Sequence, residues 1–230
     1  MNDRSFENLK QRHRAERDAY PPALSLRVHR ALSWLDRAER EADDLDGRFI
    51  FLWIAFNAAY AAEDGGQEIT ETRRFSQFLR SVLQLDKDGV FATLVWHRYP
   101  GPIRLLLDNR FAFKPFWDSL NGIDYAIDWP LLFREDTRRA HAALGRQDTH
   151  TVLHILFRRL YVVRNQLMHG GSTWGSSVNR KQLADGAAIL GDVVPRVIEV
   201  LMNHPQQDWG APCYPLIQDD DPAAALGQAG

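Results

Sequence analysis

The sequence contains one cysteine and lacks both a long apolar run and an apolar N-terminal segment. The single Cys213 excludes an internal disulfide and is typical of a protein in a reducing compartment. The longest apolar stretch, residues 49–62, is interrupted by Asn57 and is shorter than the ~20 residues that cross a bilayer. Residues 1–18 are rich in charges and have no apolar core, unlike a signal peptide. We therefore expect a soluble cytoplasmic protein with no membrane partner.

The chain also lacks a strong net charge and the common nucleotide-binding and hydrolytic motifs. Its 28 Lys and Arg residues nearly balance 30 Asp and Glu residues, which gives a formal net charge of −2. An RNA site must therefore be a local concentration of arginine. There is no Walker loop, no dinucleotide fingerprint preceded by a strand, and no nucleophile elbow. No segment sustains the alternation of apolar and polar residues that marks a strand, which predicts an all-α fold.

Amphipathic helical patterns fill most of the chain and indicate one domain. With 230 residues, 45% of them hydrophobic, the chain is long enough for a substantial core. Residues 1–20 are polar and predict a loose helix or an arm, closed by Pro21 and Pro22. We expect residues 21–217 to form a single α-helical domain and residues 218–230 to be a disordered acidic tail.

The apolar spacing predicts a series of helices within this domain. An amphipathic helix over residues 24–45 is followed by Gly47, and the next helix, residues 48–62, is apolar nearly all round and should be central. Thr70 or Thr72 caps a third helix. Residues 89–128, dense in aromatic side chains, are interpreted as short helices that elaborate the bundle. Further helices are predicted over residues 131–144, 151–169 and 178–203, the last containing Pro195.

The helix over residues 151–169 carries the most informative pattern. Asp148 or Thr149 caps its start, and a Gly-Gly pair stops it. At about 100° per residue, Arg164 falls inside the apolar stripe, between Phe157 and Met168. A buried guanidinium needs anionic or several acceptor partners, because it cannot shed its proton. Arg164 is therefore either functional, or tied to a carboxylate on another helix, or extended to the edge of the stripe.

His169 follows Arg164 by five residues and projects about 140° away from it on an ideal helix. One straight helix therefore does not direct both side chains at one substrate. They meet if the Gly-Gly end lets the last turn unwind, or if the same helix of a second subunit supplies its own pair across a two-fold axis.

The segment RNQLMH resembles the signature of the HEPN superfamily (higher eukaryotes and prokaryotes nucleotide-binding domain), in which an Arg and a polar residue precede a His. Here these residues are Arg164, Asn165 and His169. The motif ends a long amphipathic helix, HGGSTW includes its His and the residues after it, and FIFLWIAFNAAY upstream resembles the second helix of such domains. The resemblance covers about residues 24–202 and is to stand-alone bacterial and Apea-like HEPN proteins. It implies a bundle of four to five core helices, with short helices inserted before the motif helix.

The resemblance implies a metal-independent endoribonuclease with Arg164 and His169 as catalytic residues and no cofactor. Histidine suits proton transfer near neutral pH, and a planar guanidinium suits a phosphate. The implied product is a 2′,3′-cyclic phosphate, formed at a site composed from both protomers of a homodimer. The implied role is that of a toxin or anti-phage effector acting on RNA, controlled by a nucleotidyltransferase-type antitoxin or another regulatory partner. The alternative is a non-catalytic HEPN module whose motif binds a nucleotide or stabilises the dimer.

Six further residues are candidates for supporting roles. Asn165 would hold the histidine or a phosphate oxygen, and Ser172 would line the pocket with the amides around Gly170. Asn57 either faces the Arg and His pair, as a polar residue can in similar domains, or bridges to a neighbouring helix. The candidate phosphate contacts, which a solvated helix face explains equally well, are Arg158, Arg159 and Arg180.

Two other groups of residues receive structural interpretations. Arg73, Arg74 and Arg80 are interpreted as the solvated face of the third helix rather than as RNA contacts. His150 and His154 have the four-residue spacing of a helical metal pair. However, no Glu follows His150 directly and no third ligand is apparent, so no metal site is predicted.

Overall fold

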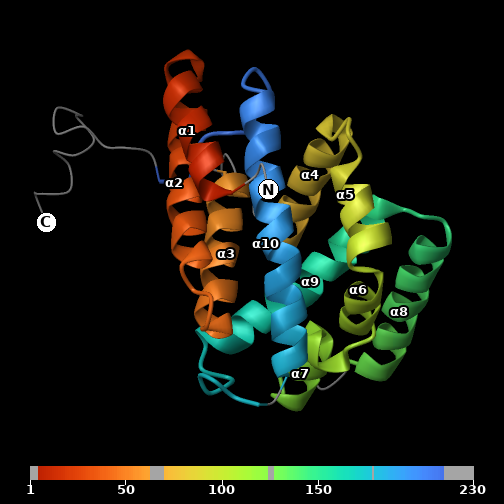
Figure 1. Ribbon diagram of the computed structural model, residues 1–230. Helices are drawn as coiled ribbons and strands as arrows, with labels where there is room; N and C mark the ends of the chain where they lie inside the picture. The colour runs from red at the N-terminus through yellow and green to blue at the C-terminus, as the bar shows by residue number, and fades with distance from the viewer. Residues whose placement is uncertain (1–4, 63–69, 124–126, 178, 215–230) are drawn as a thin grey trace, which may run out of the picture.

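The computed structural model describes residues 5–62, 70–123, 127–177 and 179–214, and every regular element within them is helical. The predicted all-α fold is confirmed, since no strand occurs in those ranges. In Figure 1, α1 (Phe6–Glu16), α2 (Pro22–Glu39) and α3 (Leu45–Tyr60) lie side by side, and α10 (Arg180–Asn203) packs against all three. The predicted tail, residues 218–230, lies outside the described residues.

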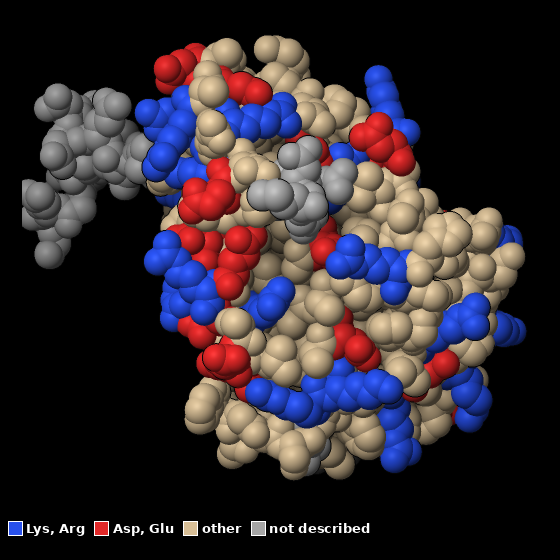
Figure 2. Space-filling model, in the orientation of Figure 1, with Lys and Arg blue, Asp and Glu red and all other residues tan. Residues whose placement is uncertain are grey.

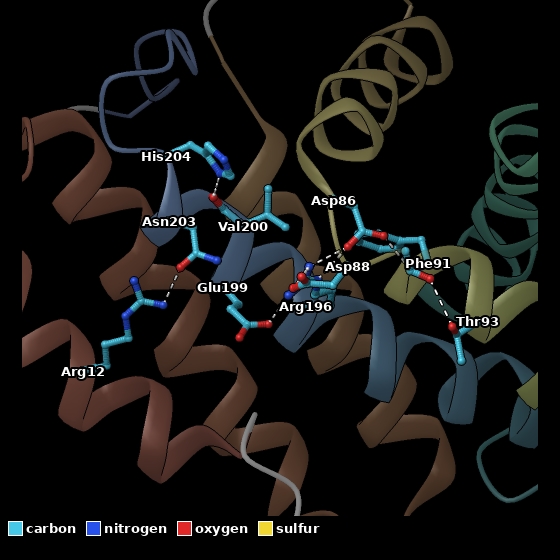
Figure 3. Close-up of polar contacts among 11 residues, drawn as sticks. Arg12, Asp86, Asp88, Phe91, Thr93, Arg196, Glu199, Val200, Asn203 and His204 are labelled. Atoms are coloured by element: carbon cyan, nitrogen blue, oxygen red, sulfur yellow. Dashed lines mark hydrogen bonds and ion pairs between the residues drawn. The ribbon is translucent and has the colours of Figure 1, made fainter.

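The N-terminal helix α1 packs against α2 and α10. Leu9 and His13, one turn apart, are its buried residues. Arg12 Nη1 donates to Asn203 Oδ1 at 2.7 Å and ties α1 to the end of α10 (Figure 3). The described part of the segment predicted as an arm or loose helix is therefore a docked helix, because its few inward positions and polar contacts are enough to fix it.

A polar cap separates α2 from α3. Helix α2 ends at Glu39, and Asp44 caps α3 by accepting the backbone N–H groups of Asp46 and Gly47, each at 3.0 Å. The prediction that the first helix reaches Leu45 and that Gly47 separates the two helices is wrong. Leu45 begins α3, and Gly47 lies in its first turn, because the cap at Asp44 sets the boundary and apolar spacing carries no information about it.

Helix α3 is central, as its apolar sequence predicts. It packs against α2, α10 and α9 (Thr149–Met168), and its Phe49, Trp53 and Phe56 side chains are at most 1% exposed. Helix α10 approaches so closely at Gly186 that an added Cβ would lie 2.9 Å from Leu160 Cδ2 of α9 and 3.0 Å from Phe49 Cε2. This glycine lets three helices meet at one point and sets α9 against the core.

Helix α4 (Glu71–Leu85) is capped by Thr70, whose Oγ1 accepts the N–H of Arg73 at 3.4 Å, so one of the two predicted caps is confirmed. The predicted short helices follow α4, and α8 (Trp129–Gly145) then leads to α9 and packs against it. The short elements are α5 (Val90–Thr93), the π-helical turn η2 (Leu94–Arg98), α6 (Pro100–Leu107), the 3-10 turn η3 (Arg110–Ala112) and α7 (Lys114–Leu120).

A buried arginine on α10 fastens this helix to the turn after α4. Arg196 Nη2 lies 2.6 Å from Asp86 Oδ1, and its Nη1 lies 2.6 Å from Glu199 Oε2 (Figure 3). Asp86 also accepts the N–H of Phe91 at 2.9 Å, so one carboxylate joins α10 to α5. Pro195 lies inside α10, which continues through it. These contacts attach the segment that contains α4 and α5 to the rest of the bundle.

Charge is mixed on the face shown in Figure 2, where basic and acidic side chains are interspersed over most of the surface. This agrees with the near balance of 28 basic and 30 acidic residues. No helix in the described ranges combines the length and apolar character needed to cross a membrane. Individual clusters of charge, rather than a global field, therefore distinguish one part of the surface from another.

Candidate active site

Helix α9 presents the motif at a regular helix end. Asp148 caps the start of α9, as predicted, by accepting a backbone N–H at 3.0 Å. At the other end the N–H of Gly171 donates to the carbonyl of Gln166 at 2.7 Å, and that of Gly170 donates to the carbonyl of Leu167 at 3.3 Å. With Gly170 at φ +69°, this pair of bonds is a Schellman motif. The glycines stop the helix without unwinding its last turn.

This helix end does not turn Arg164 and His169 toward each other. The N–H of His169 still donates to the carbonyl of Asn165 at 3.0 Å, so the helical bonding is intact up to the cap. On such a helix the two side chains project about 140° apart. His169 itself is exposed. The pair was expected to meet either through unwinding of the last turn or across a two-fold axis between subunits. The last turn is not unwound in this structure.

Arg164 lies half-buried at the edge of the apolar stripe rather than inside it. Met168, predicted as its buried neighbour, is 51% exposed, so the stripe ends one turn earlier than the spacing predicts. Arg164 Nη1 donates to Asn165 Oδ1 at 2.9 Å, and its guanidinium carbon lies 5.9 Å from the centre of the Tyr161 ring. Among the residues that the structure describes, no carboxylate forms an ion pair with Arg164. The interpretation of Arg164 as a structural ion-pair partner therefore does not apply.

Arg164 lies near a cluster of two tyrosines and one carboxylate from three helices. Tyr60, at the end of α3, donates its hydroxyl to Glu71 Oε1 of α4 at 2.8 Å. Burial above all, and then the Glu71 carboxylate, raise the pKa of Tyr60, while the positive charge of Arg164 acts in the opposite direction. Burial also raises the pKa of Tyr161, and a hydrogen bond with Asn165 partly offsets that rise. The Glu71 carboxylate in this cluster is therefore already engaged by Tyr60.

Asn57 lies on the side of α3 that faces α9. Trp53, one turn earlier, packs on Tyr161 of the motif helix with ring centres 6.1 Å apart, and residues four apart share a helix face. Asn57 Oδ1 is buried and has no hydrogen-bond partner in the described structure, in contrast to the expectation that a buried amide is paired. Such an orphaned acceptor costs about 1–3 kcal/mol.

Two of the arginines predicted as phosphate contacts share one carboxylate on α8. Arg159 is 1% exposed, with Nη2 2.6 Å from Asp136 Oδ2 and 3.2 Å from the Leu107 carbonyl. Its assignment as a phosphate contact is wrong, because the side chain is enclosed and its donors are engaged. Arg158 Nη1 lies 2.9 Å from the other Asp136 oxygen, yet 30% of the Arg158 side chain remains exposed. Arg158 therefore stays accessible to an anion.

The third predicted phosphate contact, Arg180 at the start of α10, binds the carboxylate of Asp46 on α3. The same Asp46 oxygen accepts the N–H of Gly175 at 3.2 Å, and Trp174 Nε1 donates to Asp44 Oδ2 at 3.2 Å. These bonds tie the loop after the motif to the start of α3. Spacing along the chain gave no signal for them, because the partners are at least 129 residues apart.

A pocket of about 450 Å³ opens beside the end of α9, along the loop that follows the motif. Ser172 lines this pocket, but Arg164, Asn165 and His169, with which it was expected to share one site, do not. Its polar lining consists of amides and hydroxyls, apart from the Asp46 carboxylate that the loop and α10 already engage. Gln166 and Leu167 of the motif segment line the pocket, so the structure places it beside α9 but away from the Arg164, Asn165 and His169 side chains.

His150 and His154 stack one turn apart, with ring centres 6.5 Å apart. Burial, followed by the charges of Arg158 and Arg139, lowers the pKa of His154 to about 4. His154 is therefore a neutral imidazole near pH 7. In the part of the chain that the structure describes, no group of three or more His, Cys, Asp or Glu side chains is placed to hold a metal ion.

Comparisons with protein-family models, with curated proteins and with solved structures find no match for this chain. A functional assignment therefore rests on the motif and on its surroundings. The structure supplies a half-buried arginine held by its neighbour Asn165, an exposed histidine at the helix cap, and an unpaired acceptor, Asn57 Oδ1, on the facing helix.

Proposed function

We propose that this protein is a metal-independent endoribonuclease of the HEPN type, with Arg164 and His169 as its catalytic residues. The observation that carries the proposal is the state of Arg164, a half-buried guanidinium held by Asn165 and without a carboxylate partner among the described residues. At the edge of the apolar stripe, with one amide oxygen and one aromatic ring as its described neighbours, the guanidinium keeps donors available for an anion. A phosphate of RNA supplies that anion in a geometry that a guanidinium fork matches.

The divergence of the two side chains supports a site shared by two copies of the chain. A two-fold axis near the end of α9 would set the His169 of one copy opposite the Arg164 of the other. Met168, which is 51% exposed next to His169, offers apolar surface for such a contact. The proposal therefore includes a homodimer that brings two arginines and two histidines around one RNA strand.

Cleavage at this site needs a base, an acid and a cation. One His169 removes the proton of a ribose 2′-hydroxyl, and the resulting oxygen attacks the adjacent phosphorus. The bond from phosphorus to the 5′-oxygen breaks, and the His169 of the second copy, which enters protonated, donates its proton to that leaving oxygen. Arg164 stabilises the charge that builds on the non-bridging oxygens. The products are a 2′,3′-cyclic phosphate and a 5′-hydroxyl, and no metal ion is required.

Asn165 and Asn57 have supporting roles in this scheme. Asn165 fixes the guanidinium of Arg164 through the 2.9 Å hydrogen bond, so the fork is oriented before the phosphate arrives. Asn57 Oδ1 is buried and has no partner among the described residues, so it accepts a hydrogen bond from a ribose hydroxyl only when its side chain turns toward the RNA. Ser172, in the loop pocket, does not touch the reacting atoms.

The test is cleavage of end-labelled RNA by the purified protein in excess EDTA, beside the His169→Ala and Arg164→Ala proteins. We expect the wild type alone to cleave and to leave cyclic phosphate ends. Both side chains lie at the surface or half-buried, so circular dichroism and thermal unfolding should show both variants folded. Cleavage by His169→Ala at the wild-type rate would refute the site. No cleavage by any of the three, with nucleotide binding retained, would instead favour a non-catalytic binding module.

A further inference from the structure

A second cavity, of about 720 Å³, lies between α4 and α9 and is lined by side chains of both helices. Three guanidinium groups, one imidazole and several hydroxyl groups line it, and no carboxylate is among its lining residues. We call this cavity the arginine groove. The residues that matter for its chemistry are Arg73, Arg80, Arg158, His154, Ser76 and Ser81.

The arginine groove is positively charged in a protein of formal net charge −2. Arg73 and Arg80 are exposed, and neither forms an ion pair with an acidic residue in the described ranges. Arg158 pairs with Asp136, but the same carboxylate also pairs with the buried Arg159. Arg158, Arg159 and Asp136 together therefore carry a net charge of +1. The groove therefore holds about three uncompensated positive charges side by side, which attract an anion with several phosphates.

His154 and the hydroxyl groups add neutral donors to these charges. The pKa of His154 is lowered to about 4, chiefly by burial, so its ring is neutral near pH 7 and carries one N–H donor. His154 lines the groove although its Nδ1 atom is buried, so a phosphate meets another edge of the ring. Phosphate oxygens accept from donors of these kinds.

The arginine groove leads toward the motif. Helices α4 and α9 run in opposite directions, since His150 Nε2 of α9 lies 3.5 Å from the Ser76 carbonyl, whereas Glu71 acts on Tyr161 eleven residues later in α9. Along α9, His154, Arg158, Tyr161 and Asn165 recur at steps of four, three and four residues and share one face. Asn165 holds Arg164. A chain of phosphates that leaves the groove in this direction passes the Glu71 carboxylate, which Tyr60 engages, on its way to Asn165 and the catalytic arginine.

We propose that the arginine groove binds the phosphodiester backbone of single-stranded RNA that extends from the cleavage site, an inference that rests on the proposed ribonuclease function. Packed helices lie only about 8–10 Å apart, so the groove between α4 and α9 is too narrow for a duplex. No Phe, Tyr or Trp is among its described lining residues, so bases have no stacking platform there. The groove holds RNA without reading its sequence, because charges and hydroxyls contact phosphates rather than base edges.

The test measures RNA binding in the His169→Ala protein, so that cleavage does not interfere. Fluorescence anisotropy with a labelled single-stranded RNA of mixed sequence is recorded over a series of salt concentrations. The groove variant adds Arg73→Glu and Arg80→Glu. The control variant adds Arg14→Glu and Arg104→Glu, which change the net charge equally at two exposed positions on α1 and α6, outside the groove.

We expect the groove variant to bind RNA at least about tenfold more weakly and the control variant to bind like the parent protein. The slope of log K against log salt should fall by about 1.4 in the groove variant, from about 0.7 for each of two lost phosphate contacts. Duplex RNA of equal length should bind more weakly than the single strand. Equal affinity of the groove and control variants, or the absence of salt-dependent binding, would overturn the inference.

The two proposals fail in different ways. Cleavage in EDTA by the wild type reports on the motif, whereas affinity in the His169→Ala background reports on the groove. If the groove variant loses affinity and the wild type never cleaves RNA, the groove proposal is supported and the nuclease proposal is refuted. If the wild type cleaves RNA and the groove variant binds with unchanged affinity, the groove proposal is refuted and the nuclease proposal is supported.

Discussion

Arg159 of α9 and Asp136 of α8 form an ion pair in the interior of the protein, with Arg159 Nη2 2.6 Å from Asp136 Oδ2 and the two side chains 1% and 10% exposed. The guanidinium also lies over the Phe113 ring, 4.8 Å from its centre. The arginine that α9 buries is therefore Arg159, five residues before the motif arginine, Arg164. This arrangement leaves Arg164 outside the structural ion pairs of the core.

The Asp136 carboxylate is predicted to be essential for stability. Asp136→Ala leaves the enclosed Arg159 charge without its partner, so we expect a loss of about 3–5 kcal/mol in the free energy of unfolding. Urea unfolding followed by circular dichroism measures this loss. Asp36→Ala is the control, because the ion pair of Asp36 with Arg40 lies at the surface and should contribute at most about 1 kcal/mol. Equal losses in the two variants would contradict the assignment.

The end of the motif helix is predicted to depend on a glycine. Gly170 has φ +69°, where a side chain is disfavoured, so Gly170→Ala should lower the free energy of unfolding by about 1–2 kcal/mol. The matched control is Gly145→Ala at the end of α8, where a Cβ would meet open space at an ordinary φ. There alanine should be neutral or stabilising by up to about 1 kcal/mol. Thermal unfolding of both variants measures these changes. A Gly170→Ala protein more stable than the wild type would show that α9 does not end in a Schellman motif.

Stability is predicted to fall in mild acid because of His154. The pKa of His154 is lowered from 6.5 to about 4, mainly by burial, so below pH 6.5 the unfolded chain binds a proton that the folded chain resists. This contribution is fully present above pH 6.5 and is lost progressively as the pH falls toward 4. Urea unfolding at pH 7.5 and pH 5, in wild type and His154→Gln, isolates it. The wild type should lose more stability between the two pH values, and identical losses would argue against a buried neutral ring.

A shared site predicts that inactive protein interferes with active protein. When wild type is mixed with His169→Ala and subunits exchange, heterodimers contain one histidine instead of the base and acid pair. RNA cleavage should then fall with the square of the wild-type fraction, whereas independent protomers would give a linear fall. Adding an unrelated inert protein at the same concentration controls for simple dilution. A linear response would show that one protomer is sufficient.

Much of the fold followed from interactions between residues close in the chain. The cap at Thr70, the cap at Asp148 and the stop at Gly170 were predicted because each involves groups within about five residues of one another. The all-α class followed in the same way from helical periodicity. The boundary at Leu45 was missed, because an apolar residue that continues one helical spacing can also begin the next helix.

The candidate site was predicted only in part. The order of Arg164, Asn165 and His169 and their divergence on one helix are properties of the local chain, and the structure keeps them. Which of three nearby arginines is buried depended instead on Asp136, a residue of another helix that no spacing connects to α9. Ser172 lines a pocket, but that pocket does not include the side chains of Arg164, Asn165 or His169.

Local sequence thus determined the helices, their caps and the motif residues, because hydrogen bonds within one helix fix them. Tertiary structure decided which arginines are enclosed, which are engaged and which face solvent, because burial depends on the helices that pack alongside. Arg73 and Arg80 gave no signal beyond a solvated face until α4 lay against α9 and set them beside Arg158. A charge cluster built from two helices exists only in the folded chain, since its members are brought together by packing and not by sequence.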